Sequence, residues 1–407
     1  MKKNIRLKIF FLGIYAILMT MRYFQTVVGM YNTTLLAFSY QYGFISRGLV
    51  GTCFQWLDRI LPWDMYTYRG AQMFSFGLHL MFLMLLLVFF WYCLSKSERL
   101  FHTGMLGIMF IFATFAFPEF VTFENMGRVD SVMAILTLAG VFLVIAGKFE
   151  WMLIPLAAAG VCIHQGYVLM FISIFIVLLT AKAIDHRKKG WGKYAFILIF
   201  MVLTAAVLFL YVNYFSHEYG EEIYPKIYER AQAISADGGV HKQLMDHEIL
   251  GENPAADEWT LHLFNFREIL VFGILVLPYI WILMLLFGRC VKEASGFWQK
   301  IKYLVLLFGG DILLLPDFAM KIDYGRWVFC IIFYYAIVIL ALVANGDQLL
   351  CRHFYKIFCQ LKKWQALCIL LLLYPTLLTP LGDIWITELS KNLTKVVFRI
   401  PGDMLFF

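Results

Sequence analysis

The stretch Thr122-Phe-Glu-Asn-Met-Gly-Arg-Val-Asp130 stands directly before an apolar segment, Ser131 to Gly147. With its flanks, that segment is long enough to cross a bilayer. The stretch places four polar side chains just before the start of the segment: Glu124, Asn125, Arg128 and Asp130. Charge at a membrane boundary is ordinary, but three ionisable groups within seven residues indicate a polar site at the end of a helix bundle.

A second stretch repeats this arrangement nearer the C-terminus. Lys321-Ile-Asp-Tyr-Gly-Arg-Trp327 precedes the apolar segment Val328 to Val343, and both stretches carry Gly-Arg immediately before the helix. The match is too short to indicate a duplication. It adds Lys321, Asp323 and Arg326 to the candidate site residues.

The composition predicts an all-α, polytopic membrane protein. Hydrophobic residues make up 62% of the 407 positions, charged residues only 15%, and the mean hydropathy is +0.75. Soluble domains contain roughly a quarter charged residues. Long apolar runs with short charged connectors favour transmembrane helices over a β-barrel. The eight cysteines form no CxxC pair, so we expect neither a zinc site nor a disulfide framework.

Hydropathy predicts about eleven spans, with the N-terminus in the cytoplasm and the first helix retained. The region 151–183 is too long for one span and is divided at His164, so it reads as two short spans or as a re-entrant hairpin. The expected spans are 9–30, 74–95, 103–120, 130–147, 151–164, 166–183, 194–215, 268–288, 303–318, 327–344 and 365–381.

The distribution of charge supports this orientation. The segments placed inside hold 20 of the 34 basic residues but only 5 of the 27 acidic residues, as the positive-inside rule requires. This bias also explains the net charge of +7 without any nucleic-acid partner.

The same topology predicts four regions. An N-terminal transmembrane half, 1–215, contains a long outer loop, 31–73, with an amphipathic helix around Trp56 to Arg59 in the membrane interface. An acidic outer domain, 216–267, leads into a C-terminal transmembrane half, 268–382. The remaining residues, 383–407, form an outer amphipathic tail.

Three arginines assigned to the outer side, Arg47, Arg128 and Arg326, each adjoin a glycine. Guanidinium groups bind phosphate in a two-pronged geometry, so three of them suit the diphosphate of a lipid headgroup. The alternative is that each arginine interacts with its own surroundings and binds no ligand. Arg128 then pairs with Glu124, Arg326 pairs with Asp323, and Arg47 extends along the interface.

Candidate proton acceptors accompany these arginines. Asp130 and His164 are the first choices and Asp323 the next, although Asp130 also suits a helix N-cap and His164 a helix carbonyl. Gln165 adds a hydrogen-bonding group. Asp311 lies within a span, where an ionisable side chain is by default functional. No nucleotide-binding, metalloprotease or hydrolase motif is present, so an enzyme here would take a substrate already activated in the membrane.

The chain resembles the polymerases of bacterial surface polysaccharides. These include O-antigen and capsule polymerases and EpsG-type exopolysaccharide proteins. The resemblance rests on the number of spans, the enlarged outer loop, the arginines Arg128 and Arg326 at outer helix ends, and the stretch His164-Gln-Gly-Tyr167. The resemblance implies a bacterial cytoplasmic membrane, a polyprenyl-diphosphate-linked saccharide donor, a glycan acceptor, and neither metal nor cofactor. C-type glycosyltransferases are a competing resemblance, but they carry an acidic residue early in the first outer loop, where this chain has Tyr42-Gly-Phe-Ile-Ser-Arg47.

The expected function is therefore glycosyl transfer at the outer face of the membrane. Arg47, Arg128 and Arg326 would stabilise the diphosphate leaving group. Two alternatives remain. A flippase or transporter of lipid-linked sugars would use Asp311 and the outer charges, and a membrane acyltransferase would use His164.

Overall fold

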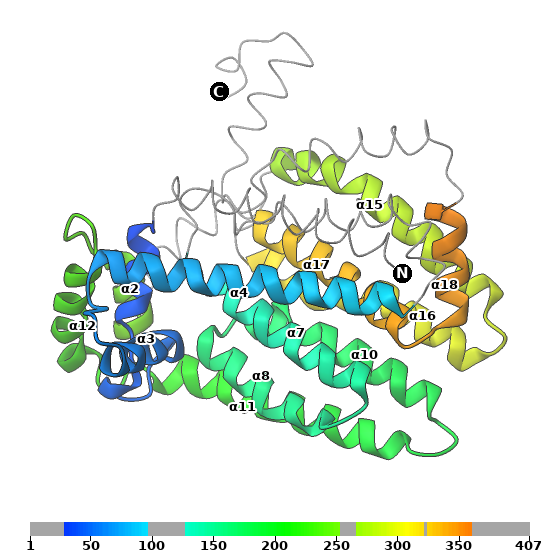
Figure 1. Ribbon diagram of the computed structural model, residues 1–407, viewed down its shortest axis with the longest axis horizontal. Helices are drawn as coiled ribbons and strands as arrows, with labels where there is room; N and C mark the ends of the chain where they lie inside the picture. Colours follow the sequence, from blue (N-terminus) through cyan, green and yellow to red (C-terminus); the bar gives the residue numbers. More distant parts are fainter. Residues whose placement is uncertain (1–27, 97–126, 253–265, 321–323, 360–407) are drawn as a thin grey trace, which may run out of the picture. The chain divides into compact units, whose positions relative to one another are not determined.

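The computed structural model describes residues 28–96, 127–252, 266–320 and 324–359 (Figure 1). Every regular element among them is helical, which confirms the all-α prediction. The predicted spans 9–30, 103–120 and 365–381 lie wholly or almost wholly outside the described residues. So do the tail 383–407 and four candidate site residues: Glu124, Asn125, Lys321 and Asp323.

Three helices in the described part are long and apolar enough to cross a membrane. They are Tyr68–Cys93, Tyr167–Asp185 and Trp191–Phe215. A fourth is added if Cys330–Ala344 and Gln348–Ile357, which meet at an angle of 118°, count as one broken span. The described residues thus support three or four spans by length and composition.

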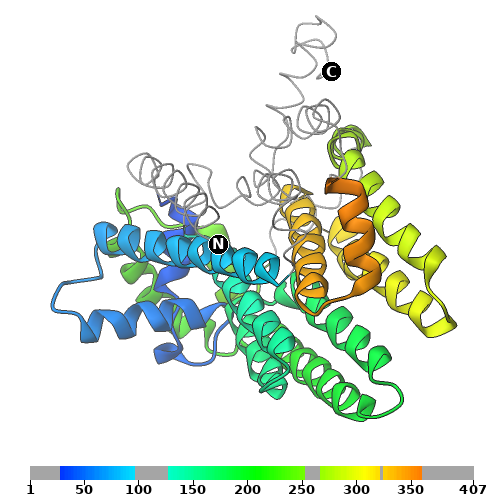
Figure 2. The same ribbon diagram turned by 45° about the vertical axis from the view of Figure 1, so that its right-hand side comes forward.

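The chain divides into two compact units. The loop unit contains Met1–Leu85, Phe120–Val132 and Phe215–Glu252, and the helix unit contains the rest of the chain. Helices α4 (Tyr68–Ser95) and α7 (Asp130–Ala146) contribute to both units (Figures 1 and 2).

The loop unit is built from short helices. Besides the first part of α4, it contains α2 (Met30–Ala37), η1 (Tyr40–Tyr42), α3 (Gly48–Ile60), α12 (Gly220–Ile234), α13 (Lys242–Met245) and the π-helical turn η4 (Asp246–Leu250). Helix α2 packs against both α3 and α12, although about 180 residues of sequence separate α2 from α12. A Cβ atom on Gly51 would lie 1.9 Å from the carbonyl oxygen of Phe38, so only glycine permits the approach of α3 to the end of α2.

Helix α3 is amphipathic, as its apolar spacing predicts. Val50 and Phe54 are buried, whereas Trp56 and Ile60 on the other face are exposed. The helix predicted around Trp56 to Arg59 is therefore confirmed. Its position in a membrane interface remains a prediction.

The helix unit contains the longer helices. Helix α16 (Phe297–Met320) packs against α10 (Ile172–Asp185), α15 (Phe266–Glu293) and α17 (Tyr324–Ala344). The other elements are α8 (Leu153–Ile163), α9 (Tyr167–Met170), α11 (Trp191–Phe215), α18 (Gln348–Phe354), η3 (Glu150–Met152) and η5 (Tyr355–Cys359). Aromatic residues fill its core. Phe171 packs edge-to-face on Phe333, and a Cβ atom on Gly310 would collide with the ring of Tyr334.

The region 151–183 is broken where the sequence predicts. Helix α8 ends at Ile163, and α9 begins at Tyr167, so the polar residues between them interrupt the helix. Gly160 allows this packing because a Cβ atom there would lie 2.3 Å from the ring of Tyr167. The Tyr167 hydroxyl lies 3.1 Å from Oγ1 of Thr137 on α7.

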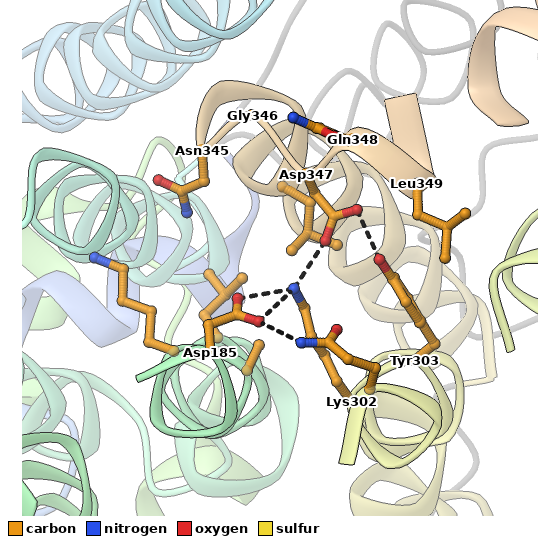
Figure 3. A pocket seen from close by; sticks show the side chains of 13 residues that line it. Asp185, Lys302, Tyr303, Asn345, Gly346, Asp347, Gln348 and Leu349 are labelled. Atoms are coloured by element: carbon orange, nitrogen blue, oxygen red, sulfur yellow. Dashed lines mark hydrogen bonds and ion pairs between the residues drawn. The ribbon is translucent and has the colours of Figure 1, made fainter. Parts of the chain in front are cut away.

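Ion pairs join the ends of helices in this unit. The buried Lys302 Nζ lies 2.8 Å from Asp185 at the end of α10 and 2.8 Å from Asp347, which caps α18 (Figure 3). The fully buried Glu150 accepts from both Lys182 and Lys193. Each of these six side chains belongs to a segment that the sequence places on the inner side.

Replacing Lys302 with methionine should lower the free energy of unfolding by about 3 kcal/mol, because the buried Asp347 carboxylate then lacks its counter-charge. Lys300→Met is the matched control, since Lys300 is on the same helix but exposed, and it should change stability by less than about 0.5 kcal/mol. Chemical unfolding of the purified protein in detergent measures both. Equal losses in the two variants would contradict the role of Lys302.

Candidate functional site

The most deeply buried charge pair of the loop unit joins its two long loop segments. Nη2 of Arg47 lies 2.7 Å from Oε1 of Glu248, and the two side chains are only 7% and 2% exposed. Ser46 donates a hydrogen bond of 2.5 Å to the other carboxylate oxygen of Glu248. The first outer loop and the acidic outer domain, predicted separately from the sequence, therefore meet at a buried ion pair.

The backbone of Arg47 has an uncommon conformation. Arg47 precedes α3 with a φ of +58°, in the left-handed region that residues other than glycine adopt rarely. Its Nη1 donates a hydrogen bond of 2.5 Å to the hydroxyl of Tyr31 on α2. Glu248 lies in the π-helical turn η4. Arg47 is thus held by α2 and η4 at once.

This pairing bears on the predicted role of Arg47. A guanidinium whose charge is matched by a buried carboxylate attracts a diphosphate less than an unpaired one. The role of Arg47 in binding a substrate stays a prediction. Its contacts with Glu248 and Tyr31 give it a structural role as well. Sequence reasoning missed Glu248, because 202 residues separate it from Ser46 and its neighbours are ordinary for a helical turn.

The Gly127-Arg128 turn belongs to the same unit. Gly127 has a φ of +92°, and a Cβ atom there would lie 2.6 Å from Oγ of Ser75 on α4 and 3.4 Å from Cβ of Asn32 on α2. The turn therefore packs against two polar, buried side chains. Arg128 is partly exposed, and its carbonyl oxygen accepts a hydrogen bond of 3.0 Å from Ser131.

Asp130 is the first residue of α7 and is 1% exposed. The sequence offered two roles for it, a helix cap and a base. Its place in the first turn suits the positive end of the helix dipole, where a carboxylate is stabilised. Among the predicted site residues that the structure describes, Arg47, Arg128 and Asp130 belong to the loop unit.

The other described candidates belong to the helix unit. His164 follows α8, is 4% exposed, and its Nδ1 accepts a hydrogen bond of 2.8 Å from the backbone N–H of Gly166. This contact requires an unprotonated Nδ1. It is a local contact with a backbone N–H group, whereas the local alternative predicted from the sequence was a contact with a helix carbonyl. Gln165 lies beside it in the helix break and is partly exposed. Arg326 lies in the first turn of α17, and its side chain is not among those described.

Asp311 has an interhelical partner. Its Oδ2 accepts a hydrogen bond of 2.5 Å from the Tyr335 hydroxyl on α17. Among the described residues, its buried Oδ1 has no hydrogen-bond partner. One of the two carboxylate oxygens of Asp311 is therefore paired between helices, and its functional role stays a prediction.

The loop unit also contains a cation–aromatic contact that the sequence did not reveal. The guanidinium of Arg230 on α12 lies 4.1 Å from the ring centre of Tyr66 and 5.8 Å from that of Tyr42. Burial lowers the pKa of Arg230, whereas Tyr42 and Asp58 act in the opposite direction. No cluster of three or more histidine, cysteine, aspartate or glutamate side chains among the described residues is placed to hold a metal ion.

Disrupting the Arg47–Glu248 pair should destabilise the loop unit. Glu248→Gln leaves Arg47 buried without its counter-charge and should cost about 3 kcal/mol of unfolding free energy. Arg47→Met combined with Glu248→Leu should cost less, because no uncompensated charge remains. The control, Glu222→Gln, removes an exposed pair with Lys226 and should cost less than about 0.5 kcal/mol. A double variant less stable than Glu248→Gln would contradict this account.

The loop unit should also lose stability in mild acid. Burial lowers the pKa of His241 from its usual value of 6.5, and its Nδ1 accepts the backbone N–H of Leu244, which requires a neutral ring. The unfolded chain then binds more protons than the folded chain, so this contribution is present above about pH 6.5 and declines as the pH falls below it. His241→Asn keeps a capping side chain that does not titrate. Unfolding midpoints at about pH 7.5 and about pH 5.5 should therefore differ less in this variant than in the wild type.

Comparison of the chain with protein-family models, with curated proteins and with solved structures finds no match. The functional interpretation therefore rests on the residues and contacts described above.

Proposed function

We propose that the chain is a membrane glycosyltransferase of the surface-polysaccharide polymerase type. It transfers a sugar or oligosaccharide from a polyprenyl-diphosphate-linked donor to a glycan acceptor, at the outer face of a bacterial cytoplasmic membrane. One observation carries this proposal: the segments that the sequence assigns to the outer side assemble into a single compact unit that contains Arg47, Arg128 and Asp130.

The segments that form the loop unit support the proposed topology of about eleven spans. The predicted spans and the charge distribution together place three segments far apart in the chain on the outer side: 31–73, 127–130 and 216–252. The contacts between α2 and α12, between Arg47 and Glu248, and between Gly127 and Ser75 bring these segments together. Segments on opposite sides of a bilayer about 30 Å thick do not meet in this way.

Ion pairs in the helix unit support the same topology. The pairs of Lys302 with Asp185 and Asp347, and of Glu150 with Lys182 and Lys193, join ends assigned to the inner side. Arg352 and Glu293, which also lie on that side, form a further pair at 3.6 Å. The orientation read from the lysines and arginines is consistent with both sets of contacts.

The chemistry follows from the leaving group. An acceptor hydroxyl attacks the anomeric carbon of the donor, the bond between that carbon and the diphosphate oxygen breaks, and the hydroxyl proton passes to a carboxylate or imidazole. In this scheme Arg128 and Arg326 stabilise the charge that develops on the diphosphate. Asp130 is the preferred base because it lies two residues from Arg128 and belongs to the same unit. His164 and Asp323 are the alternatives.

One contact favours a second candidate function, the movement of lipid-linked saccharides across the membrane. Asp311 and Tyr335 form a polar pair between two helices of the helix unit. Polar groups at that depth are typical of a translocation path. This candidate predicts that lipid-linked intermediates accumulate on the inner side when the protein is inactive, whereas the transferase predicts accumulation on the outer side.

Arg128→Ala should lower the yield of long-chain surface glycan by about a hundredfold or more, because it removes a charge that stabilises the leaving group. Arg69→Ala is the matched control, since Arg69 is an exposed arginine of the loop unit and should leave the glycan unchanged. Chain length is measured on glycans from cells expressing equal amounts of each variant. Normal glycan from Arg128→Ala would refute the assignment. Lipid-linked intermediates confined to the inner side would favour the transport function.

A further inference from the structure

The helix unit contains a polar pocket of about 300 Å³ at the ends of α10, α16 and α17 (Figure 3). The turn from Asn345 to Asp347, which joins α17 to α18, covers one side of the pocket together with Gln348 and Leu349 at the start of α18. Asp185, Lys302 and Tyr303 face that turn from the opposite side. None of the residues assigned to the proposed glycosyl transfer lines this pocket.

The buried cation of the pocket, Lys302, is fully paired. The Lys302 ammonium has three N–H groups, and its hydrogen bonds go to Oδ1 and Oδ2 of Asp185 and to Oδ2 of Asp347. Lys302 therefore has no N–H group left for an anion. Lys182, a second cation of the lining, already donates to Glu150 and to the carbonyl oxygen of Val144.

Asp185 is the lining carboxylate with room for another partner. A carboxylate offers about four acceptor positions, and Asp185 receives two hydrogen bonds from Lys302 and one from Gln299. Its side chain is 41% exposed, whereas that of Asp347 is 6% exposed. A ligand ammonium can therefore contact Asp185 from the open side, as the Lys302 ammonium does from within.

The chain that follows Asp185 has the opposite charge. Arg187, Lys188 and Lys189 lie two to four residues after Asp185 and are all exposed. A ligand that suits both Asp185 and these residues carries an ammonium group for the carboxylate and a phosphate for the basic side chains. The volume of the pocket, about 300 Å³, is at the small end of the range for ligand pockets and suits a small group.

We propose that this pocket binds a phosphoethanolamine group, with its ammonium on Asp185 and its phosphate among the basic residues that follow α10. The group comes either from a phosphatidylethanolamine molecule of the adjoining leaflet or from a soluble phosphoethanolamine compound. Phosphatidylcholine has the same phosphate but no N–H donor, so it separates recognition of the ammonium from general attraction to phosphate.

The test uses the full-length protein, purified in detergent and stripped of lipid. Native mass spectrometry compares phosphatidylethanolamine with phosphatidylcholine of the same acyl chains. We expect about a tenfold preference for phosphatidylethanolamine, the usual effect of one hydrogen bond to a charged group. Asp185→Asn should abolish the preference and Asp185→Glu should retain it. Asp237→Asn, the same substitution at an exposed aspartate of the loop unit, should leave it unchanged.

Competition with soluble phosphoethanolamine identifies the source of the group. Displacement of the lipid at millimolar concentration indicates that the headgroup alone is recognised, and retention of the lipid indicates that the acyl chains contribute. Equal binding of the two lipids by the wild type would overturn the proposal, as would an unchanged preference in Asp185→Asn. These outcomes concern binding alone, so they are independent of the glycan measurements on Arg128.

Discussion

A charge removed from water needs a partner, and this requirement organises both units of the protein. In the loop unit, the buried Glu248 carboxylate is matched by Arg47 and Ser46. In the helix unit, Lys302 is enclosed by two aspartates, and Glu150 by two lysines. Each pair or triad joins segments distant in sequence. Removal of one partner is costly, so these contacts specify which helix ends meet.

The sequence predicts the helical class and several element boundaries because those depend on local patterns. The apolar run after Asp130 becomes α7, and the polar residues from His164 to Gly166 interrupt the chain as expected. The amphipathic spacing around Trp56 predicts α3. These features follow from hydrophobic periodicity and from the positions of polar residues, which are visible within a window of about twenty residues.

Ion pairs between residues far apart in the chain cannot be predicted from such local patterns. Nothing near Arg47 indicates that its counter-charge lies in the outer domain, and nothing near Lys302 indicates that two aspartates converge on it. The sequence therefore predicts for Arg47 either a ligand contact or an extended side chain along the interface, and it predicts no buried ion pair for Lys302. The structure gives both Arg47 and Lys302 buried carboxylate partners. Asp311 differs, because the rarity of an acidic residue within an apolar helix marks it in the sequence as a functional candidate, although its partner Tyr335 is visible only in the structure.

The distance in sequence between Ser46 and Glu248 has a consequence for biogenesis. The two residues are 202 positions apart, and chains are synthesised at about 5 to 20 residues per second. After Arg47 leaves the ribosome, about ten to forty seconds pass before Glu248 follows. During that interval the apolar helices between the two residues are synthesised while Arg47 is without its carboxylate. The loop unit is thus completed late in synthesis, and a chain truncated before η4 lacks the carboxylate that pairs with Arg47.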